Sequence, residues 1–140
     1  MSVIDDDDDV RRSVEWALRA MGLEVRGYAS ALQCLQQRDP AAPPPDCLLT
    51  DVNMPGMSGV ELLETMTEAG TAPVCVVLTV CGDAATAVRA MKAGAFDYLE
   101  KPFQLQQLHD AVHKALAHGQ KLATRRAAPA SRTRATPWPR

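Results

Sequence analysis

Residues 48–59 read LLTDVNMPGMSG, and this stretch decides which fold the chain is expected to adopt. A short apolar run leads into Asp51 and is closed by a Pro-Gly turn, a pattern typical of a buried strand that ends at the surface. We therefore expect Asp51 to be exposed at the rim of a sheet. Ser58, followed three residues later by Glu61, predicts a capping box at the start of a helix.

The same alternation of strand and helix continues in both directions along the chain. We expect strands at residues 3–4, 24–28, 47–50, 74–78 and 96–99, and helices that run from about Asp7 to Gly22, from Ser30 to about Arg38, from Ser58 onward, from Asp83 to Gly94 and from about Gln104 to His118. The proline-rich segment 39–46 is expected to be a surface loop. Short right-handed crossovers then place helices on both faces of a parallel sheet, so the predicted class is α/β and doubly wound.

Polar side chains follow the predicted strands. They are Asp5 and Asp6, Asp51, Thr79 and Lys101. Because the carboxyl ends of parallel strands open at one edge of a sheet, we expect these groups to meet in one crevice. Carboxylates there can hold Mg²⁺, Asp51 can attack phosphorus as a nucleophile, and Thr79 and Lys101 can contact phosphoryl oxygens.

The run of five aspartates has a second interpretation, as a solvated acidic segment at the positive end of a helix. We favour this interpretation for Asp7, Asp8 and Asp9. Asp5 and Asp6, taken alone, fit either interpretation, and the matching groups at the other strand ends favour a metal site.

Charge is distributed unevenly over the 140 residues. Residues 1–118 contain 9 basic and 17 acidic side chains, a formal charge of −8, whereas residues 119–140 contain six basic and no acidic ones. An acidic body is not typical of a nucleic-acid-binding domain. The tail, rich in Ala, Arg, Thr and Pro, is expected to be disordered.

The cysteine spacing and the hydropathy of the chain indicate the cellular compartment in which the protein is expected to be found. Cys47 and Cys75 fall in predicted strands and are expected to be core residues, and Cys81 to be a spectator thiol. The four cysteines form no C-x-x-C pair, which argues against a zinc site or a disulfide framework. Without a membrane span or a signal peptide, the expected location is the cytoplasm.

Four segments, in their order and spacing, resemble the receiver domain of two-component response regulators. They are VIDDD, LLTDVNMPGMSG, VVLT and AMKAGAFDYLEKPF, and the resemblance covers about residues 2–118. The resemblance is strongest to the FixJ-like branch, whose members normally continue into a LuxR-type helix-turn-helix. It implies a flavodoxin-like (βα)5 fold with strand order 2-1-3-4-5, a receiver domain at 1–118, and a tail or truncated linker at 119–140.

The resemblance also implies roles for the residues of the crevice. Asp51 would accept a phosphoryl group from a sensor histidine kinase, and Thr79 and Lys101 would contact that group. Mg²⁺ would be bound by Asp6, with Asp5 assisting through water, by Asp51 and by the backbone carbonyl of Asn53. Tyr98 would be the aromatic switch residue, and a cis peptide bond would precede Pro102.

Phosphorylation would then change the surface of the fourth helix, fifth strand and fifth helix, and so control a homodimer or an output, with transcription regulation the expected output. One departure is Val80, where the family usually has Ala or Gly, and we expect altered phosphorylation or dephosphorylation rates. Two other functions stay open. A phosphatase or phosphotransferase is disfavoured because Asn53 stands where such an enzyme has its second aspartate, and a phosphorylation-independent pseudo-receiver is disfavoured because the whole site set is present.

The tail has three interpretations: a truncated linker, the natural end of a stand-alone receiver, or a basic arm. Its six basic residues would support weak, salt-sensitive contact with nucleic acid, and any specific DNA contact would need an output domain.

Overall fold

The structure is a computed structural model, and it describes residues 1–37, 47–70, 73–80 and 82–131, with side chains placed as far as Gly119. Its elements in chain order are β1 (Ser2–Ile4), α1 (Asp8–Ala20), β2 (Arg26–Tyr28), α2 (Ala31–Gln37), β3 (Cys47–Asp51), α3 (Gly59–Glu68), β4 (Val74–Val80), α4 (Ala84–Lys92), β5 (Asp97–Lys101) and α5 (Leu105–Ser131). The predicted loop at 39–46, Cys81 and residues 132–140 lie outside the described residues.

The five strands form one parallel sheet in the order β2-β1-β3-β4-β5, which confirms the predicted fold class and strand order. β1 lies between β2 and β3, so Ile4 is paired with Tyr28 on one side and Thr50 on the other. β3 pairs with β4 so that Asp51 lies beside Leu78. Successive strands are therefore added toward one edge of the sheet from β1 to β2 and toward the other edge from β3 onward, and a doubly wound sheet has its crevice at such a switch point, between β1 and β3.

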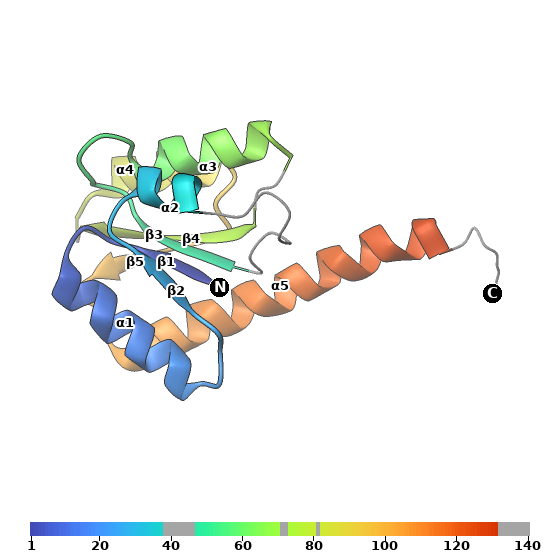
Figure 1. Ribbon diagram of the computed structural model, residues 1–140, viewed down its shortest axis with the longest axis horizontal. Helices are drawn as coiled ribbons and strands as arrows, with labels where there is room; N and C mark the ends of the chain where they lie inside the picture. The colour runs from blue at the N-terminus through green and yellow to red at the C-terminus, as the bar shows by residue number, and fades with distance from the viewer. Residues whose placement is uncertain (38–46, 71–72, 81, 132–140) are drawn as a thin grey trace.

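Helices cover both faces of the sheet, with α1 and α5 on one side and α2, α3 and α4 on the other (Figure 1). Each side has its own apolar core. Leu18, Leu108 and Val112 pack against one face, and Leu62, Leu63 and Met66 against the other. The central strands are apolar on both sides because both of their faces are covered. Cys47 and Cys75 are fully buried, as predicted.

The helices begin at or next to the predicted residues, and α1 and α4 end just before the predicted glycines. Asp7 caps α1, Ser58 and Glu61 form the predicted capping box of α3, and Asp83 caps α4. α1 and α4 are followed by Gly22 and Gly94, both in the left-handed conformation that glycine adopts without a steric penalty. Each carboxylate or hydroxyl cap satisfies backbone N–H groups that the first turn of a helix leaves without partners.

The predicted end of the last helix at His118 was wrong. α5 continues to Ser131, for a total of 27 residues, and its second half extends away from the sheet (Figure 1). Gly119 costs a helix about 1 kcal/mol relative to alanine, and the alanine-rich sequence that follows contains enough strong helix formers to propagate the helix past it. No helix in the described part of the chain combines the length and the apolar character that crossing a membrane requires.

Candidate functional site

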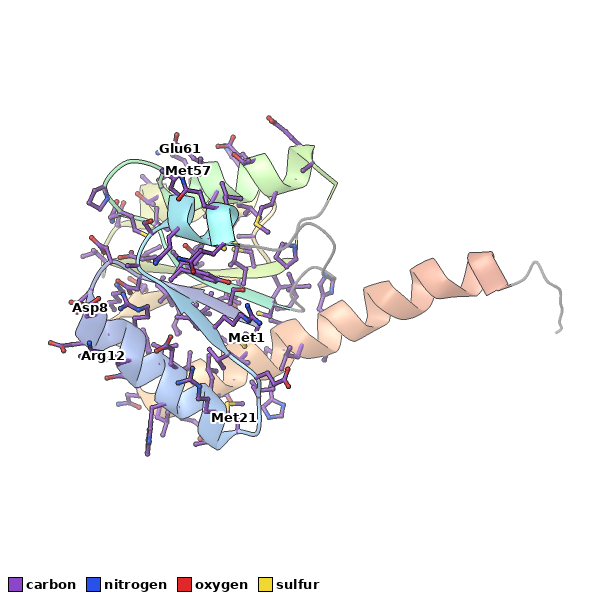
Figure 2. The ribbon with its side chains drawn as sticks, in the orientation of Figure 1. Met1, Asp8, Arg12, Met21, Met57 and Glu61 are labelled. Carbon is purple, nitrogen blue, oxygen red and sulfur yellow. The ribbon has the colours of Figure 1, made fainter. Side chains whose placement is uncertain are left out.

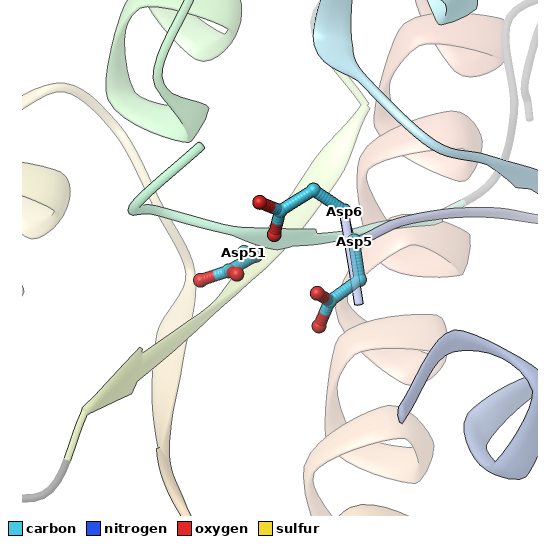
Figure 3. Close-up of side chains that lie close together, drawn as sticks. All are labelled: Asp5, Asp6 and Asp51. Atoms are coloured by element: carbon cyan, nitrogen blue, oxygen red, sulfur yellow. The ribbon is translucent and has the colours of Figure 1, made fainter. Parts of the chain in front are cut away.

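Three carboxylates meet where β1 and β3 end. One oxygen from each of Asp5, Asp6 and Asp51 lies within 4.8 Å of the other two, and Figure 3 shows the three side chains side by side at this edge of the sheet. Asp5 and Asp51 are buried, and Asp6 is exposed to solvent. The predicted exposure of Asp51 was wrong. Asp51 is the last paired residue of β3 and is only 6% exposed, because the strand continues one residue farther than expected.

Lys101 supplies the positive charge of the site. Its ammonium donates a hydrogen bond to Asp5 Oδ2 at 2.9 Å and forms an ion pair with Asp51 Oδ2 at 3.3 Å. Lys101 is the last residue of β5, and the Lys101–Pro102 peptide bond is cis, as the resemblance implied. One ammonium thus bridges the two buried carboxylates, while the third carboxylate, that of Asp6, is exposed to solvent.

The site is electrostatically unbalanced. Burial raises the pKa of Asp51, and the charge of Asp5 raises it further, against the opposing effect of Lys101. Burial alone would lower the pKa of Lys101, but its hydrogen bond to Asp5 and the charges of Asp5 and Asp51 outweigh that effect, so the pKa of Lys101 is raised. Lys101 is therefore firmly protonated, and it leaves negative charge near Asp51 that a further cation would neutralise.

Thr79 lies on the neighbouring strand, one position before the end of β4. The residue is 1% exposed, and its hydroxyl has no hydrogen-bond partner within the described residues. A buried hydroxyl without a hydrogen-bond partner lowers the stability of the folded state by about 1–3 kcal/mol. Such a group is therefore usually retained for a function. An acceptor brought into the crevice would supply the missing partner.

The N-terminus of α1 adjoins this crevice. Asp7 accepts hydrogen bonds from the N–H groups of Asp9 and Val10, and its own N–H donates to Asp5 Oδ1 at 2.9 Å. Asp8 lies on the outer surface of the helix (Figure 2), where its exposed carboxylate forms an ion pair with Arg11. The prediction that Asp7, Asp8 and Asp9 form a solvated segment that caps the helix is confirmed.

Sequence reasoning missed Arg11. Its guanidinium donates a 2.8 Å hydrogen bond to the backbone carbonyl of Asp5, and this side chain is only 15% exposed. The contact fixes the end of β1 to α1 and holds the Asp5 main chain in position. A basic residue one turn into a helix that follows the site is too common a pattern to indicate this contact.

The remaining predicted residues surround the crevice. The N–H of Asn53 donates to Asp51 Oδ1 at 3.3 Å, which directs the chain after β3 back toward the carboxylate. Val80 ends β4 beside Lys101 and is 55% exposed. Tyr98, on β5, is 42% exposed and lines a shallow hollow of about 370 Å³ against α4.

The family model for the response regulator receiver domain matches residues 1–113. The chain belongs to this family, whose members are phosphorylation-dependent switches of two-component systems. The sequence resemblance to receiver domains and to FixJ-like regulators is thereby confirmed.

Individual relatives agree with the family assignment. The chain is 45% identical over 116 residues to the transcriptional regulatory protein FixJ of Azorhizobium caulinodans, which covers 81% of this chain and 53% of that protein. It is 37% identical to the transcriptional regulatory protein TdiR of Thauera aromatica, over 86% of this chain and 52% of that protein. The response regulator StyR superposes with a TM-score of 0.82 at 38% identity, over 93% of this chain and 65% of that one. The chain therefore spans about half the length of these curated relatives.

Proposed function

We propose that this chain is a phosphoacceptor switch in which Asp51 receives a phosphoryl group from the phosphohistidine of a sensor histidine kinase. A carboxylate oxygen of Asp51 forms a bond to phosphorus, the bond from phosphorus to the kinase imidazole nitrogen breaks, and that nitrogen keeps the electron pair and takes up a proton. The observation that carries the proposal is the arrangement of Asp51, buried at the strand end, with Lys101 at 3.3 Å. On the adjacent strand lies the Thr79 hydroxyl, which has no partner in the part of the chain that the structure describes.

The donor set fits Mg²⁺. Hard carboxylate oxygens from Asp6 and Asp51, with Asp5 acting through water and the Asn53 carbonyl, match the ligands that this ion prefers. When bound, Mg²⁺ would neutralise charge on the transferring oxygens. The ammonium of Lys101 would also stabilise charge on these oxygens, and the Thr79 hydroxyl would donate to a phosphoryl oxygen.

The chain acts as an acceptor rather than as an enzyme that turns over external substrates. Asn53 occupies the second position after Asp51, and its carboxamide side chain has no titratable proton, so this position offers no general acid. Hydrolysis of its own acyl phosphate is the remaining chemistry, and it resets the switch.

The output surface lies on α4, β5 and α5. Val88, Met91 and Tyr98 are 51%, 42% and 42% exposed, and together they form an apolar face around the hollow between α4 and β5. Movement of Thr79 toward the phosphoryl group vacates space behind it, and Tyr98 turns inward. We expect this change to control a homodimer, as measured by sedimentation velocity with and without phosphorylation. Met91→Glu should abolish the association, and Leu32→Glu, on the exposed side of α2, should not.

We propose transcription regulation as the output, because the relatives are named transcriptional regulatory proteins and are about twice as long as the matched region. In this proposal residues 1–118 are the receiver and residues 119–140 a linker. The continuation of α5 to Ser131 supports a linker whose first part is helical.

The decisive experiment is intact mass spectrometry after incubation with phosphoramidate. We expect a Mg²⁺-dependent adduct that is stable in acid and labile in base, absent in Asp51→Asn and reduced in Asp6→Asn. The same sample, made with fluorotyrosine, reports the switch by ¹⁹F NMR, since the chain has two tyrosines and the buried Tyr28 serves as the internal reference. No adduct under any condition would instead favour a pseudo-receiver that acts without phosphorylation.

A further inference from the structure

We propose that Glu100 is a positioning residue of the switch, which anchors the N-terminal end of α4 to β5 and so favours the unphosphorylated conformation. The inference rests on the proposed function. It starts from one long-range contact: the N–H of Gly82 donates to Glu100 Oε2 at 3.1 Å, across 18 residues of sequence.

This hydrogen bond acts at the start of α4. Gly82 has a φ of 89°, in the left-handed region, and is followed at once by Asp83, the N-cap of the helix. Asp83 accepts from the Thr86 N–H at 3.2 Å and from the Thr86 hydroxyl at 2.7 Å. A group that holds Gly82 therefore holds the first turn of α4, because the cap and the turn are connected by these bonds.

Glu100 is placed to oppose the switch. On β5 it is the register partner of Thr79, and it lies two residues from Tyr98, on the same side of the strand. The hollow beside Tyr98 has α4 as its other wall, lined by Ala84, Ala87 and Met91. When Thr79 moves toward a phosphoryl group, Gly82, three residues farther along the chain, moves with it, while Glu100 stays on the paired strand β5. This movement lengthens and weakens the hydrogen bond from the Gly82 N–H to Glu100. The first turn of α4 can then change its distance from Tyr98.

Two substitutions distinguish the hydrogen bond from Gly82 to Glu100 from the negative charge of Glu100. Glu100→Ala removes the acceptor, whereas Glu100→Gln keeps an oxygen that can accept from Gly82 and removes the negative charge. Glu64→Ala, at an exposed position on α3, controls for the loss of one carboxylate elsewhere. The first readout is hydrogen exchange of the Gly82 amide by NMR in the unphosphorylated protein. We expect exchange about two- to fivefold faster in Glu100→Ala, as the loss of one modest surface hydrogen bond predicts, and near wild type in the other two variants.

The second readout is the affinity of the protein for beryllium fluoride with Mg²⁺, a stable analogue of the phosphoryl group. If the anchor favours the unliganded conformation, Glu100→Ala binds about two- to fivefold more tightly, and Glu100→Gln binds like wild type. Unchanged amide exchange, or unchanged or weaker binding in Glu100→Ala, overturns the proposal. Equal tightening in Glu100→Ala and Glu100→Gln assigns the effect to charge and overturns the anchor. Wild-type protein that binds no beryllium fluoride contradicts the proposed function itself and removes the switch on which Glu100 would act.

Discussion

Replacing Lys101 with methionine should destabilise the protein in a way that depends on pH. The substitution keeps an apolar side chain of similar length but removes the ammonium that bridges Asp5 and Asp51. Both carboxylates are buried, at 0% and 6% exposure, so neither can turn its charge to bulk water. The folded variant must hold two neighbouring negative charges or bind a proton.

The size of the loss follows from these two options. At an effective dielectric constant of about 20, the contacts at 2.9 and 3.3 Å each have a Coulomb energy of about 5–6 kcal/mol, and desolvation of Lys101 offsets much of it. Protonating one carboxylate with an ordinary pKa of 3.8 costs about 4.4 kcal/mol at pH 7 and about 1.6 kcal/mol at pH 5, which limits the loss from above. Because Lys101 is partly exposed, we expect a loss of about 2–4 kcal/mol at pH 7 and less than about 2 kcal/mol at pH 5.

The direction of the pH dependence is opposite for the two groups. The raised pKa of Lys101 means that its stabilising contribution is complete below pH 10.5 and is lost only as pH rises through its folded-state pKa. The raised pKa of Asp51 means that the cost of its charge is present above that pKa and is relieved as pH falls through it. The deficit of Lys101→Met therefore narrows from pH 7 to pH 5 because of the carboxylates.

Urea denaturation at both pH values, with and without excess MgCl₂, measures this deficit. Mg²⁺ should reduce the deficit at pH 7, since a bound cation replaces the missing charge. Lys114→Met, on the exposed surface of α5, should change the free energy of unfolding by less than about 0.5 kcal/mol. A deficit that is equal at pH 7 and pH 5, or no larger than that of the control, would refute the reasoning.

Three further predictions concern the same edge of the sheet. Asp51→Asn should raise the free energy of unfolding at pH 7 by up to about 1 kcal/mol, because it removes a buried charge beside Asp5, and urea denaturation should show the gain disappearing as pH falls through the raised pKa of Asp51. Val80→Ala should change the rate of phosphorylation by phosphoramidate, or of dephosphorylation, by at least about twofold, since the branched side chain borders access to the acceptor; two unchanged rates in a mass-spectrometric time course would contradict this. Gly59→Ala should destabilise the protein by more than about 2 kcal/mol and weaken Mg²⁺ binding by calorimetry, because a Cβ there collides with the Asp51 carbonyl oxygen; stability like that of wild type would show that α3 can shift without disturbing β3.

The fold could be predicted from local signals that agree with one another. Ser58 with Glu61, and Asp83 before α4, have side chains that satisfy N–H groups within their own turn, so the signal and its effect lie in the same few residues. Strand ends were less predictable. β3, β4 and β5 each extend one or two residues beyond the apolar run, because pairing to a neighbouring strand keeps Asp51, Thr79 and Lys101 in the ladder whatever their polarity.

The membership of the site was predictable, but its internal contacts were not. Position at the ends of parallel strands is enough to bring Asp5, Asp6 and Asp51 together. Which carboxylate Lys101 contacts most closely depends on side-chain geometry across 96 residues of sequence. The Arg11 contact to the Asp5 carbonyl and the Glu100 contact to Gly82 are of the same kind, since both join elements whose spacing is set only after the sheet has formed.

A bound cation and a phosphoryl group would together relieve the unfavourable features of the site. Two buried carboxylates share one ammonium, a third carboxylate lies within 4.8 Å, and the Thr79 hydroxyl has no partner within the described residues. Each feature destabilises the unmodified protein, and apolar residues of similar size would avoid the cost. A divalent cation would neutralise the excess negative charge, and a phosphoryl group would give the hydroxyl an acceptor. In the proposed switch, relief of these costs would favour the phosphorylated conformation, in which Thr79 and Tyr98 move.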